Sequence, residues 1–258
     1  MRILITNDDG IHAPGFRALV ETLRAEGDCV PVAPHKQCSA TGHSISLYQH
    51  ISVETVDLGN GLQGHAIEGT PADCVKFAVA ELSKDRPFDL IVSGINLGLN
   101  TGISVYYSGT VSAAREGLIN GIPAVALSQA KERVEDFSYA ANLAKKLTHD
   151  YRAGLLPKDI FLNINIPASD IKGIRVTKQA HSRFVEWFEP HAQEAPNDKK
   201  SYNIYGDLEM IAPDGTSDEE ALREGYVSFT PLQLDLTHYG RISYLQSWVT
   251  KFLQKIKP

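Results

Sequence analysis

The chain has 258 residues, with 25 lysines and arginines against 31 aspartates and glutamates, so its formal net charge is -6 at pH 7. This balance argues against nucleic-acid polymers and anionic membranes as main partners, because both attract basic surfaces. Any phosphate site in this chain must therefore be locally positive.

Cysteine use and hydropathy narrow the class of protein further. The three cysteines, Cys29, Cys38 and Cys74, lie far apart without a CxxC spacing, which indicates neither a zinc ribbon nor a disulfide framework. Arg2 follows Met1 directly, so no signal-peptide segment is expected, and no apolar run approaches the roughly 20 residues of a membrane span. We expect a cytoplasmic protein without membrane contact.

The first predicted strand ends on two carboxylates. An Ile-Leu-Ile run at residues 3–5 precedes Asp8 and Asp9, and open α/β sheets bind ligands beyond the carboxyl ends of such strands. Adjacent carboxylates repel each other, so keeping both ionised in a partly dry cleft calls for a cation. From these residues alone, a metal-ligand turn and an ordinary Asn-Asp-Asp-Gly turn both remain open.

A helix over residues 16–23 and a strand over 29–33 complete a βαβ unit with an expected right-handed crossover. The loop that follows, at 34–43, is rich in small residues and hydroxyls. Its backbone N–H groups could bind an anion, although the same residues are common in ordinary loops. The candidate residues of this loop are Ser39, Ala40, Thr41 and Gly42.

Two further elements follow this loop. Residues 44–68 alternate apolar and polar positions around a Gly-Asn-Gly turn, which predicts a hairpin inserted beside the main sheet. Thr70, Pro71 and Asp73 then form a helix start, because a hydroxyl cap, an early proline and an acidic first turn all favour one. Asp73 is thus expected to cap a helix rather than to act in catalysis.

A buried strand at 89–92 leads into a loop at 93–102 that contains three glycines. Such a loop is costly to order and is expected where the backbone approaches a ligand closely or adopts positive φ. It has neither the Walker A pattern nor the dinucleotide fingerprint. Asn96 offers an amide oxygen suited to Mg²⁺ or Mn²⁺, but a role within its own turn stays equally open.

Ser108, Gly109 and Thr110 precede a small-residue helix predicted at 111–118. The start of a helix is a ready anion site, because free N–H groups and the helix dipole point outward together. Capping of the helix by Ser108 or Thr110 would explain the same residues.

The alternation continues with a strand at 123–127, a helix at 136–151 and a strand at 161–166. This order predicts an α/β fold with a doubly wound, Rossmann-like, mostly parallel sheet. We assign residues 1–171 to an α/β catalytic core.

The pattern changes in residues 172–258, which we assign to an oligomerisation arm and carboxyl-terminal segment. Residues 178–216 are polar with interleaved aromatics, which predicts a projecting arm that contacts another subunit or stacks on bases. Apolar residues at helical spacing between 245 and 256 predict a terminal amphipathic helix.

Five motifs in the first 111 residues occur together in one known family. They are Thr6–Gly10 with Ala13–Gly15, Ala33–Pro34 with Ser39–Gly42, Gly69–Val75, Ser93–Asn96 and Tyr107–Val111. Gly225–Ser228 and Thr230–Leu232 continue the likeness, followed by Asp235 and Thr237. With these motifs the chain resembles the stationary-phase survival protein SurE family, a group of metal-dependent nucleotidases.

The resemblance implies a metal site and an activity. Asp8, Asp9, Ser39 and Asn96 would hold one divalent cation per subunit, Mg²⁺ or Mn²⁺. The implied reaction is hydrolysis of nucleoside monophosphates by a 5'/3'-nucleotidase, an acid-phosphatase-like phosphomonoesterase, with activity on short polyphosphate in some members of the family. Homodimers or homotetramers with exchanged carboxyl-terminal segments are implied as well. Ile103-Ser104 stands where the family often has acidic residues, which puts substrate preference and subunit contacts in doubt.

The residues suggest roles within such a mechanism. Asp8 and Asp9 would act in catalysis as metal ligands, one of them also as general base. A covalent role is disfavoured because aspartyl nucleophiles usually occur in an Asp-x-Asp spacing. Phosphate would be bound by Ala40, Thr41, Gly42, Asn96, Ser108, Gly109 and Thr110. The alternatives are a nucleotide sensor without turnover and an oligomeric scaffold.

Overall fold

The computed structural model describes residues 1–134, 136–191 and 200–255. Its main element is a nine-stranded sheet with the spatial order β3-β4-β2-β1-β5-β6-β7-β11-β8. The strands of this sheet are β1 Arg2–Thr6, β2 Asp28–Pro34, β3 Val53–Gly59, β4 Leu62–Ile67, β5 Leu90–Leu97, β6 Ala124–Gln129, β7 Phe161–Ile166, β8 Gly173–Val176 and β11 Tyr226–Leu232.

The centre of the sheet is parallel. β1 pairs in parallel with β2 and β5, so Ile3 lies opposite Cys29 on one side and Leu90 on the other. β6 and β7 extend the parallel part, whereas β11 is antiparallel to β7 and parallel to β8. The predicted doubly wound, mostly parallel α/β sheet is therefore confirmed.

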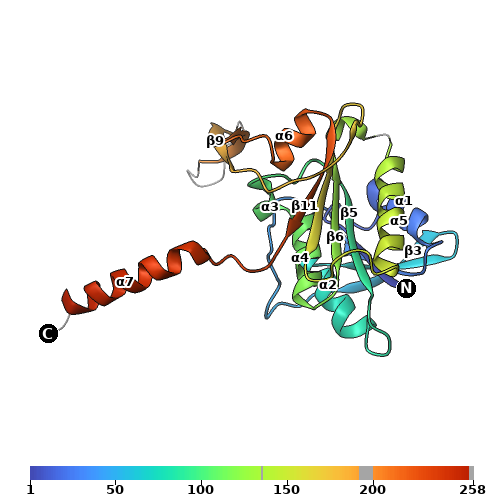
Figure 1. The fold of residues 1–258 in the computed structure, drawn as a ribbon. Helices are drawn as coiled ribbons and strands as arrows, with labels where there is room; N and C mark the ends of the chain where they lie inside the picture. Colours follow the sequence, from blue (N-terminus) through green and yellow to red (C-terminus); the bar gives the residue numbers. More distant parts are fainter. Residues whose placement is uncertain (135, 192–199, 256–258) are drawn as a thin grey trace.

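Helices cover both faces of this sheet (Figure 1). Ile3 and Ile5 join a core cluster with α1 and α5, whereas Leu4 joins a second cluster with α2 and α4 on the opposite face. Both faces are apolar because successive strand residues point to opposite sides and both sides are buried. The helices are α1 Pro14–Leu23, α2 Pro71–Phe77, the π-helical η1 Ala78–Leu82, α3 Ser104–Tyr107, α4 Gly109–Ile119, the 3₁₀-helical η2 Lys131–Arg133, α5 Ser138–Arg152, α6 Asp218–Arg223 and α7 Tyr239–Lys255.

The start of α2 is a capping box. The Thr70 side chain accepts from the Asp73 backbone N–H, and the Asp73 carboxylate accepts from the Thr70 backbone N–H. Hydrogen bonds from Thr70 and from Ser46 outweigh the effect of burial and hold the pKa of Asp73 below its usual value. The prediction that Asp73 caps a helix is confirmed.

The hairpin of β3 and β4 joins the main sheet, because β4 pairs in parallel with β2. The predicted alternation began at residue 44, but the strand begins only at Val53, so the prediction was wrong for residues 44–52. The Ser46 backbone N–H and hydroxyl donate to Asp73, and the Thr70 hydroxyl donates to the Ser44 carbonyl. These bonds tie the segment to the start of α2 and prevent it from pairing as a strand.

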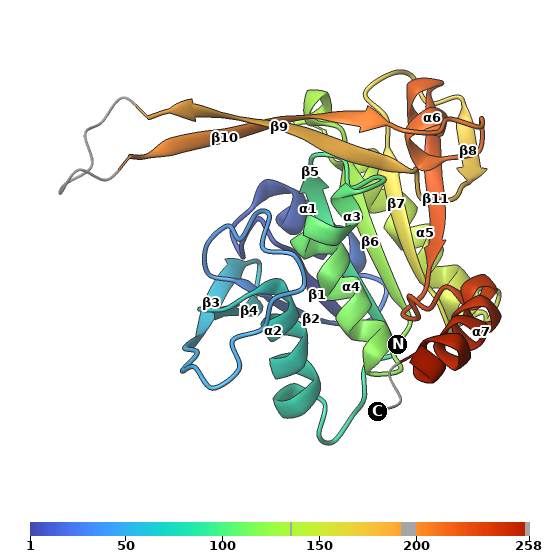
Figure 2. The same ribbon diagram turned by 90° about the vertical axis from the view of Figure 1, so that its left-hand side faces the viewer.

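A separate two-stranded sheet of β9 Ser182–Pro190 and β10 Tyr202–Met210 forms a long hairpin that projects from the body (Figure 2). This confirms the predicted arm, whose residues 192–199 lie outside the described part of the chain. The short helix α6 was not predicted. Ser217 and Glu220 form its capping box, a Ser-x-x-Glu signal that the sequence carries.

The terminal helix α7 extends away from the sheet (Figure 1). It confirms the predicted terminal helix, although Ile256 at the end of the predicted range lies outside the described residues. Among the residues that the structure describes, no helix combines the length and apolar character needed to cross a membrane. β8 and β11 belong to the main sheet, so the division at residue 171 stays a prediction about function.

Candidate functional site

A buried asparagine shapes the turn after β1. The Asn7 side chain donates to the Gly10 carbonyl at 3.0 Å and accepts from the Gly10 backbone N–H at 3.2 Å. This closed turn fixes the two carboxylates between its ends at the carboxyl edge of the sheet. The Asn-Asp-Asp-Gly sequence thus supplies both the turn and the charge that the turn presents.

Asp8 lies deeper than its neighbour, with only 5% of its surface exposed. Its carboxylate accepts a hydrogen bond from the Thr110 hydroxyl at the start of α4. Burial raises the pKa of Asp8 to about 6, the charge of Asp9 adds to the rise, and the bonds from Thr110 partly offset it. A buried carboxylate with a raised pKa next to another carboxylate favours positive charge nearby.

Asp9 is more open and is held by two neighbouring loops. It accepts from the Leu97 backbone N–H at 3.4 Å and from the Gln37 side chain at 3.2 Å. Gln37 also donates to the Ser39 hydroxyl at 2.9 Å, so one amide connects the loops that follow β1 and β2. Burial raises the pKa of Asp9 as well, against these hydrogen bonds.

Asn96 lies near the end of β5, one strand away from Asp8 and Asp9. Its side-chain nitrogen donates to the Gly98 carbonyl at 2.7 Å, so the amide oxygen remains available to the cavity. The predicted alternatives for Asn96, a turn contact and a ligand role, are therefore compatible.

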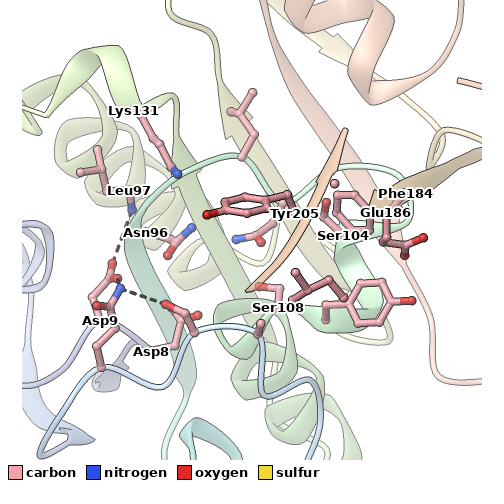
Figure 3. Close-up of a pocket in the computed structure, with 18 residues that line it drawn as sticks. Asp8, Asp9, Asn96, Leu97, Ser104, Ser108, Lys131, Phe184, Glu186 and Tyr205 are labelled. Carbon is pink, nitrogen blue, oxygen red and sulfur yellow. Dashed lines mark hydrogen bonds between the residues drawn. The ribbon is translucent and has the colours of Figure 1, made fainter. Parts of the chain in front are cut away.

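A cavity of about 710 Å³ connects these side chains to the base of the arm (Figure 3). Six of the predicted site residues line it: Asp8, Asp9, Ser39, Ala40, Asn96 and Ser108. Ser104 also lines it, so the departure from the family pattern at Ile103-Ser104 falls partly on the cavity wall.

The other four predicted residues lie behind this wall. The Thr41 hydroxyl donates to the Cys38 carbonyl at 3.0 Å, and the Gly42 backbone N–H donates to the Tyr107 carbonyl at 2.9 Å. The Thr110 hydroxyl is used by Asp8. A Cβ atom on Gly109 would lie 2.7 Å from that of Asp8, so glycine lets the helix start approach the carboxylate.

The prediction from sequence omitted several residues of the cavity wall. Tyr107 and Phe184 pack with ring centroids 5.8 Å apart, and Tyr205 lies on the neighbouring strand of the arm. Figure 3 shows Phe184 and Glu186 at the end of the cavity away from Asp8 and Asp9, with Tyr205 between the two ends. The interleaved aromatics were the available signal, but the sequence did not place the base of the arm against the sheet edge. The residues omitted from the site were Gln37, Leu97, Leu99, Asn100, Ser104, Tyr107, Lys131, Phe184, Glu186, Ile204, Tyr205 and Gly206.

The donor set at the inner end of the cavity fits a hard divalent cation. It consists of two carboxylates, a hydroxyl and an amide oxygen, which are ligands that Mg²⁺ and Mn²⁺ prefer. No group of three or more His, Cys, Asp or Glu side chains suited to a metal occurs among the described residues. A cation here would therefore need the oxygens of Ser39 and Asn96 beside the two carboxylates.

Fold and site together define an open α/β protein with a ligand cavity at the carboxyl edge of a parallel sheet and oxygen donors at its inner end. The chain belongs to the survival protein SurE family, whose family model matches residues 3–186.

Full-length relatives agree with this assignment. The chain is 42% identical over 257 residues to a protein of Syntrophus aciditrophicus named 5'-nucleotidase SurE, with 97% of this chain and 95% of that protein covered. A protein of the same name from Desulfatibacillum aliphaticivorans is 41% identical, with 96% and 98% covered. The crystal structure of the SurE protein from Aquifex aeolicus superimposes with a TM-score of 0.77 at 36% identity, covering 96% of this chain and 99% of that chain.

Proposed function

We propose that this protein is a metal-dependent nucleotidase that hydrolyses nucleoside monophosphates to nucleoside and phosphate. The observation that carries the proposal is the Asp8–Asp9 pair at the inner end of a cavity with aromatic side chains at its outer end. The relatives named 5'-nucleotidase SurE support the same reaction. Short-chain polyphosphate is included because it too presents a terminal phosphoryl group.

Asp8, Asp9, Ser39 and Asn96 would hold one divalent cation per subunit, Mg²⁺ or Mn²⁺. When bound, such an ion neutralises charge on the phosphoryl oxygens and favours ionisation of the attacking water. The raised pKa values of Asp8 and Asp9 support this assignment, because burial of both carboxylates favours a nearby positive charge.

The two carboxylates would have different roles beyond metal binding. Asp8 is buried and oriented by Thr110, so it serves mainly as a fixed ligand. Asp9 is less buried and faces the cavity, so it is better placed to accept a proton from the attacking water. Neither belongs to an Asp-x-Asp pair, and covalent attack therefore remains the least favoured role.

Backbone groups of two segments would bind the phosphate. Ala40 has a φ of 56° and Gly42 one of 58°, so the loop after β2 turns sharply beside the carboxylates. Ser108 caps α4 by accepting from the Val111 N–H, which leaves the Gly109 and Thr110 amides at the positive end of the helix. Ser39 and Ala40 of this loop and Ser108 at the helix start line the cavity, so the phosphate would approach these two segments there.

The aromatic end of the cavity suits the nucleoside. Tyr107, Phe184 and Tyr205 provide ring faces on which a base can stack, a contact that tolerates different bases. Because two of these residues belong to the arm, deleting residues 178–216 would also remove part of the cavity wall. Such a deletion therefore cannot separate a scaffold function of the arm from nucleotide binding.

The deciding experiment measures phosphate release from a panel of 5' and 3' nucleoside monophosphates and tripolyphosphate, with Mg²⁺, with Mn²⁺ and with chelator. We expect turnover with at least one metal and none after complete metal removal. Activity that survives metal removal would contradict the proposed mechanism. Nucleotide binding without phosphate release in any metal would favour a sensor.

Assembly is the second part of the proposal. Residues 1–171 would carry catalysis, and residues 172–258 would join subunits into a homodimer or homotetramer by exchange of carboxyl-terminal segments. The support is α7, which stands away from its own sheet and exposes half of the Trp248 and Leu253 side chains. A cytoplasmic location accompanies this proposal, consistent with three free cysteines.

A further inference from the structure

Lys131 follows β6 on a loop that is anchored on several sides. The Gln129 side chain donates to the carbonyls of Arg133 and Asp136, and the Arg133 guanidinium donates to the carbonyls of Pro167 and Ser169. These bonds connect the loop to itself and to the segment after β7. The backbone that carries Lys131 is therefore fixed at the same sheet edge as the carboxylates.

The side chain of Lys131 passes over Gly98 and reaches the cavity. A Cβ atom on Gly98 would lie 3.5 Å from the Lys131 Cε atom and 3.7 Å from the Asn96 side-chain nitrogen. Gly98 has a φ of 135°, a conformation that other residues rarely adopt. The lysine stem thus lies over a stretch of bare backbone, and Figure 3 shows its ammonium nitrogen directed into the cavity.

The charge of Lys131 is not used elsewhere in the described part of the chain. None of the ion pairs between described residues includes it. It is also the only lysine or arginine among the described residues that line the cavity, whereas three carboxylates do so: Asp8, Asp9 and Glu186. Lys131 is therefore the side chain of this cavity best suited to stabilise a bound anion, because its positive charge would attract the anion.

We propose that Lys131 binds the phosphoryl group of the substrate, on the side away from Asp8 and Asp9. The inference rests on the proposed nucleotidase function and adds a substrate-binding residue to it. A charge-assisted hydrogen bond from an ammonium to a phosphate oxygen stabilises both the dianionic substrate and the charge that spreads over its oxygens during transfer. Lys131 makes this contact from the loop after β6, whereas the other proposed phosphate-binding residues belong to the loop after β2, the end of β5 and the start of α4.

The test compares Lys131→Gln with Lys131→Arg and with Lys146→Gln, which removes a charge from an exposed position on α5. We expect Lys131→Gln to lower kcat/KM for a nucleoside monophosphate by about 10- to 100-fold, the worth of one hydrogen bond to a charged group. Arginine should restore most of the loss because it keeps the charge. Lys146→Gln should match the wild type.

Product inhibition separates a phosphate contact from a structural effect. Inorganic phosphate should inhibit Lys131→Gln about 10-fold or more weakly than the wild type, whereas inhibition by the nucleoside should not change. Equal weakening of both products, or of neither, would overturn the proposal, as would failure of arginine to restore phosphate binding.

A separate binding measurement keeps this test independent of turnover. Calorimetric titration of inorganic phosphate into wild type and Lys131→Gln, each with Mn²⁺, should show weaker binding to the variant. Absence of nucleotide turnover in the wild type would contradict the proposed function but leave this comparison decisive for Lys131. Absence of phosphate binding to the wild type, or equal binding to both proteins, would contradict the lysine assignment.

Discussion

The sheet edge and the two projecting elements differ in what their polar and apolar groups contact. At the edge, Asp8 accepts a hydrogen bond from Thr110 of α4, Asp9 accepts one from Leu97 at the end of β5, and Asn96 donates one to the Gly98 carbonyl. On the arm and on α7, large apolar side chains such as Phe188 and Trp248 remain exposed. Rigid support suits a site that positions charge, whereas exposed apolar faces are stabilised by burial against another surface.

The arm belongs to both regions. Its base contributes Phe184 and Tyr205 to the cavity, while its outer part exposes Phe188 and Tyr202. We therefore propose two roles within one hairpin, with nucleoside contact at the base and subunit contact farther out. The predictions below separate the two regions.

The largest expected effect comes from the carboxylate pair. Asp8→Asn and Asp9→Asn should each lower metal-dependent kcat by about 1,000-fold or more, because each removes the charge of a carboxylate that we propose as a metal ligand. Phosphate release assays with a thermal unfolding control would measure this. Asp150→Asn, an exposed change on α5, should leave activity intact. Full activity in both site variants would refute their roles.

The second effect concerns assembly through α7. The Trp248 and Phe252 rings stack with centroids 4.9 Å apart on its exposed apolar face. Replacing both by aspartate should abolish association and leave a species of 28.3 kDa, since buried charge at an apolar interface is strongly unfavourable.

Light scattering after size exclusion would measure this mass. The matched control, Ser247→Asp with Thr250→Asp, adds the same charge at other exposed positions of α7 and should stay associated. A monomeric wild type, or unchanged assembly of the apolar-face variant, would contradict the proposed role of the helix.

The third effect is a pH dependence of stability in metal-free protein. The pKa of Asp8 is raised from 3.8 to about 6, so folding favours its protonated form. Well below pH 3.8 the carboxyl of Asp8 is protonated in both the folded and the unfolded protein, so it does not lower the free energy of unfolding. As pH rises through this window, the folded protein should lose up to about 3 kcal/mol relative to Asp8→Asn, with a plateau above pH 6.

Urea unfolding of both proteins with chelator, at several values between pH 4 and pH 8, would measure this difference. Because Asp8→Asn keeps the size of the side chain, the difference between the two curves isolates the ionisation. Parallel curves across the whole range would contradict a buried Asp8 whose pKa is raised.

The smallest expected effect lies at the base of the arm. Tyr205→Ala should raise KM for a nucleoside monophosphate by about 10-fold, corresponding to the loss of one stacking contact. KM for ribose 5-phosphate, which lacks a base, should change much less. Tyr202→Ala removes an exposed ring of the same arm that does not line the cavity, and it should leave both values unchanged. Equal effects of the two variants would remove the distinction between base and outer arm.

Local signals predicted the parts of the fold that depend on nearby residues. The apolar runs at 3–5 and 161–166 are strands of the sheet, and Thr70 with Asp73 forms the capping box that their spacing indicated. Residues 44–52 show the limit, because their alternation favoured a strand, whereas the structure, which describes all of them, has no strand there and Ser46 donates two hydrogen bonds to Asp73 instead. Those bonds join segments 27 residues apart, which periodicity does not report.

The candidate site was predictable to a similar extent. Asp8, Asp9 and Asn96 were accessible from sequence because each lies at or just beyond the carboxyl end of a parallel strand, and such strands end at one edge. Thr110 was predicted to bind phosphate, but its hydroxyl is taken by Asp8. That outcome depends on how closely α4 approaches β1, a packing distance that no local pattern specifies.

By itself, the sequence determined the alternation of strands and helices along the chain, the capping box at the start of α2 and the presence of two adjacent carboxylates at a strand end. These features depend on residue type and spacing within short segments. The tertiary structure alone decided that the base of the arm completes the cavity, that Asp8 is buried deeply enough to raise its pKa, and that Lys131 enters from the loop after β6. Each of these depends on contacts between segments far apart in the chain, where burial and distance set the energy.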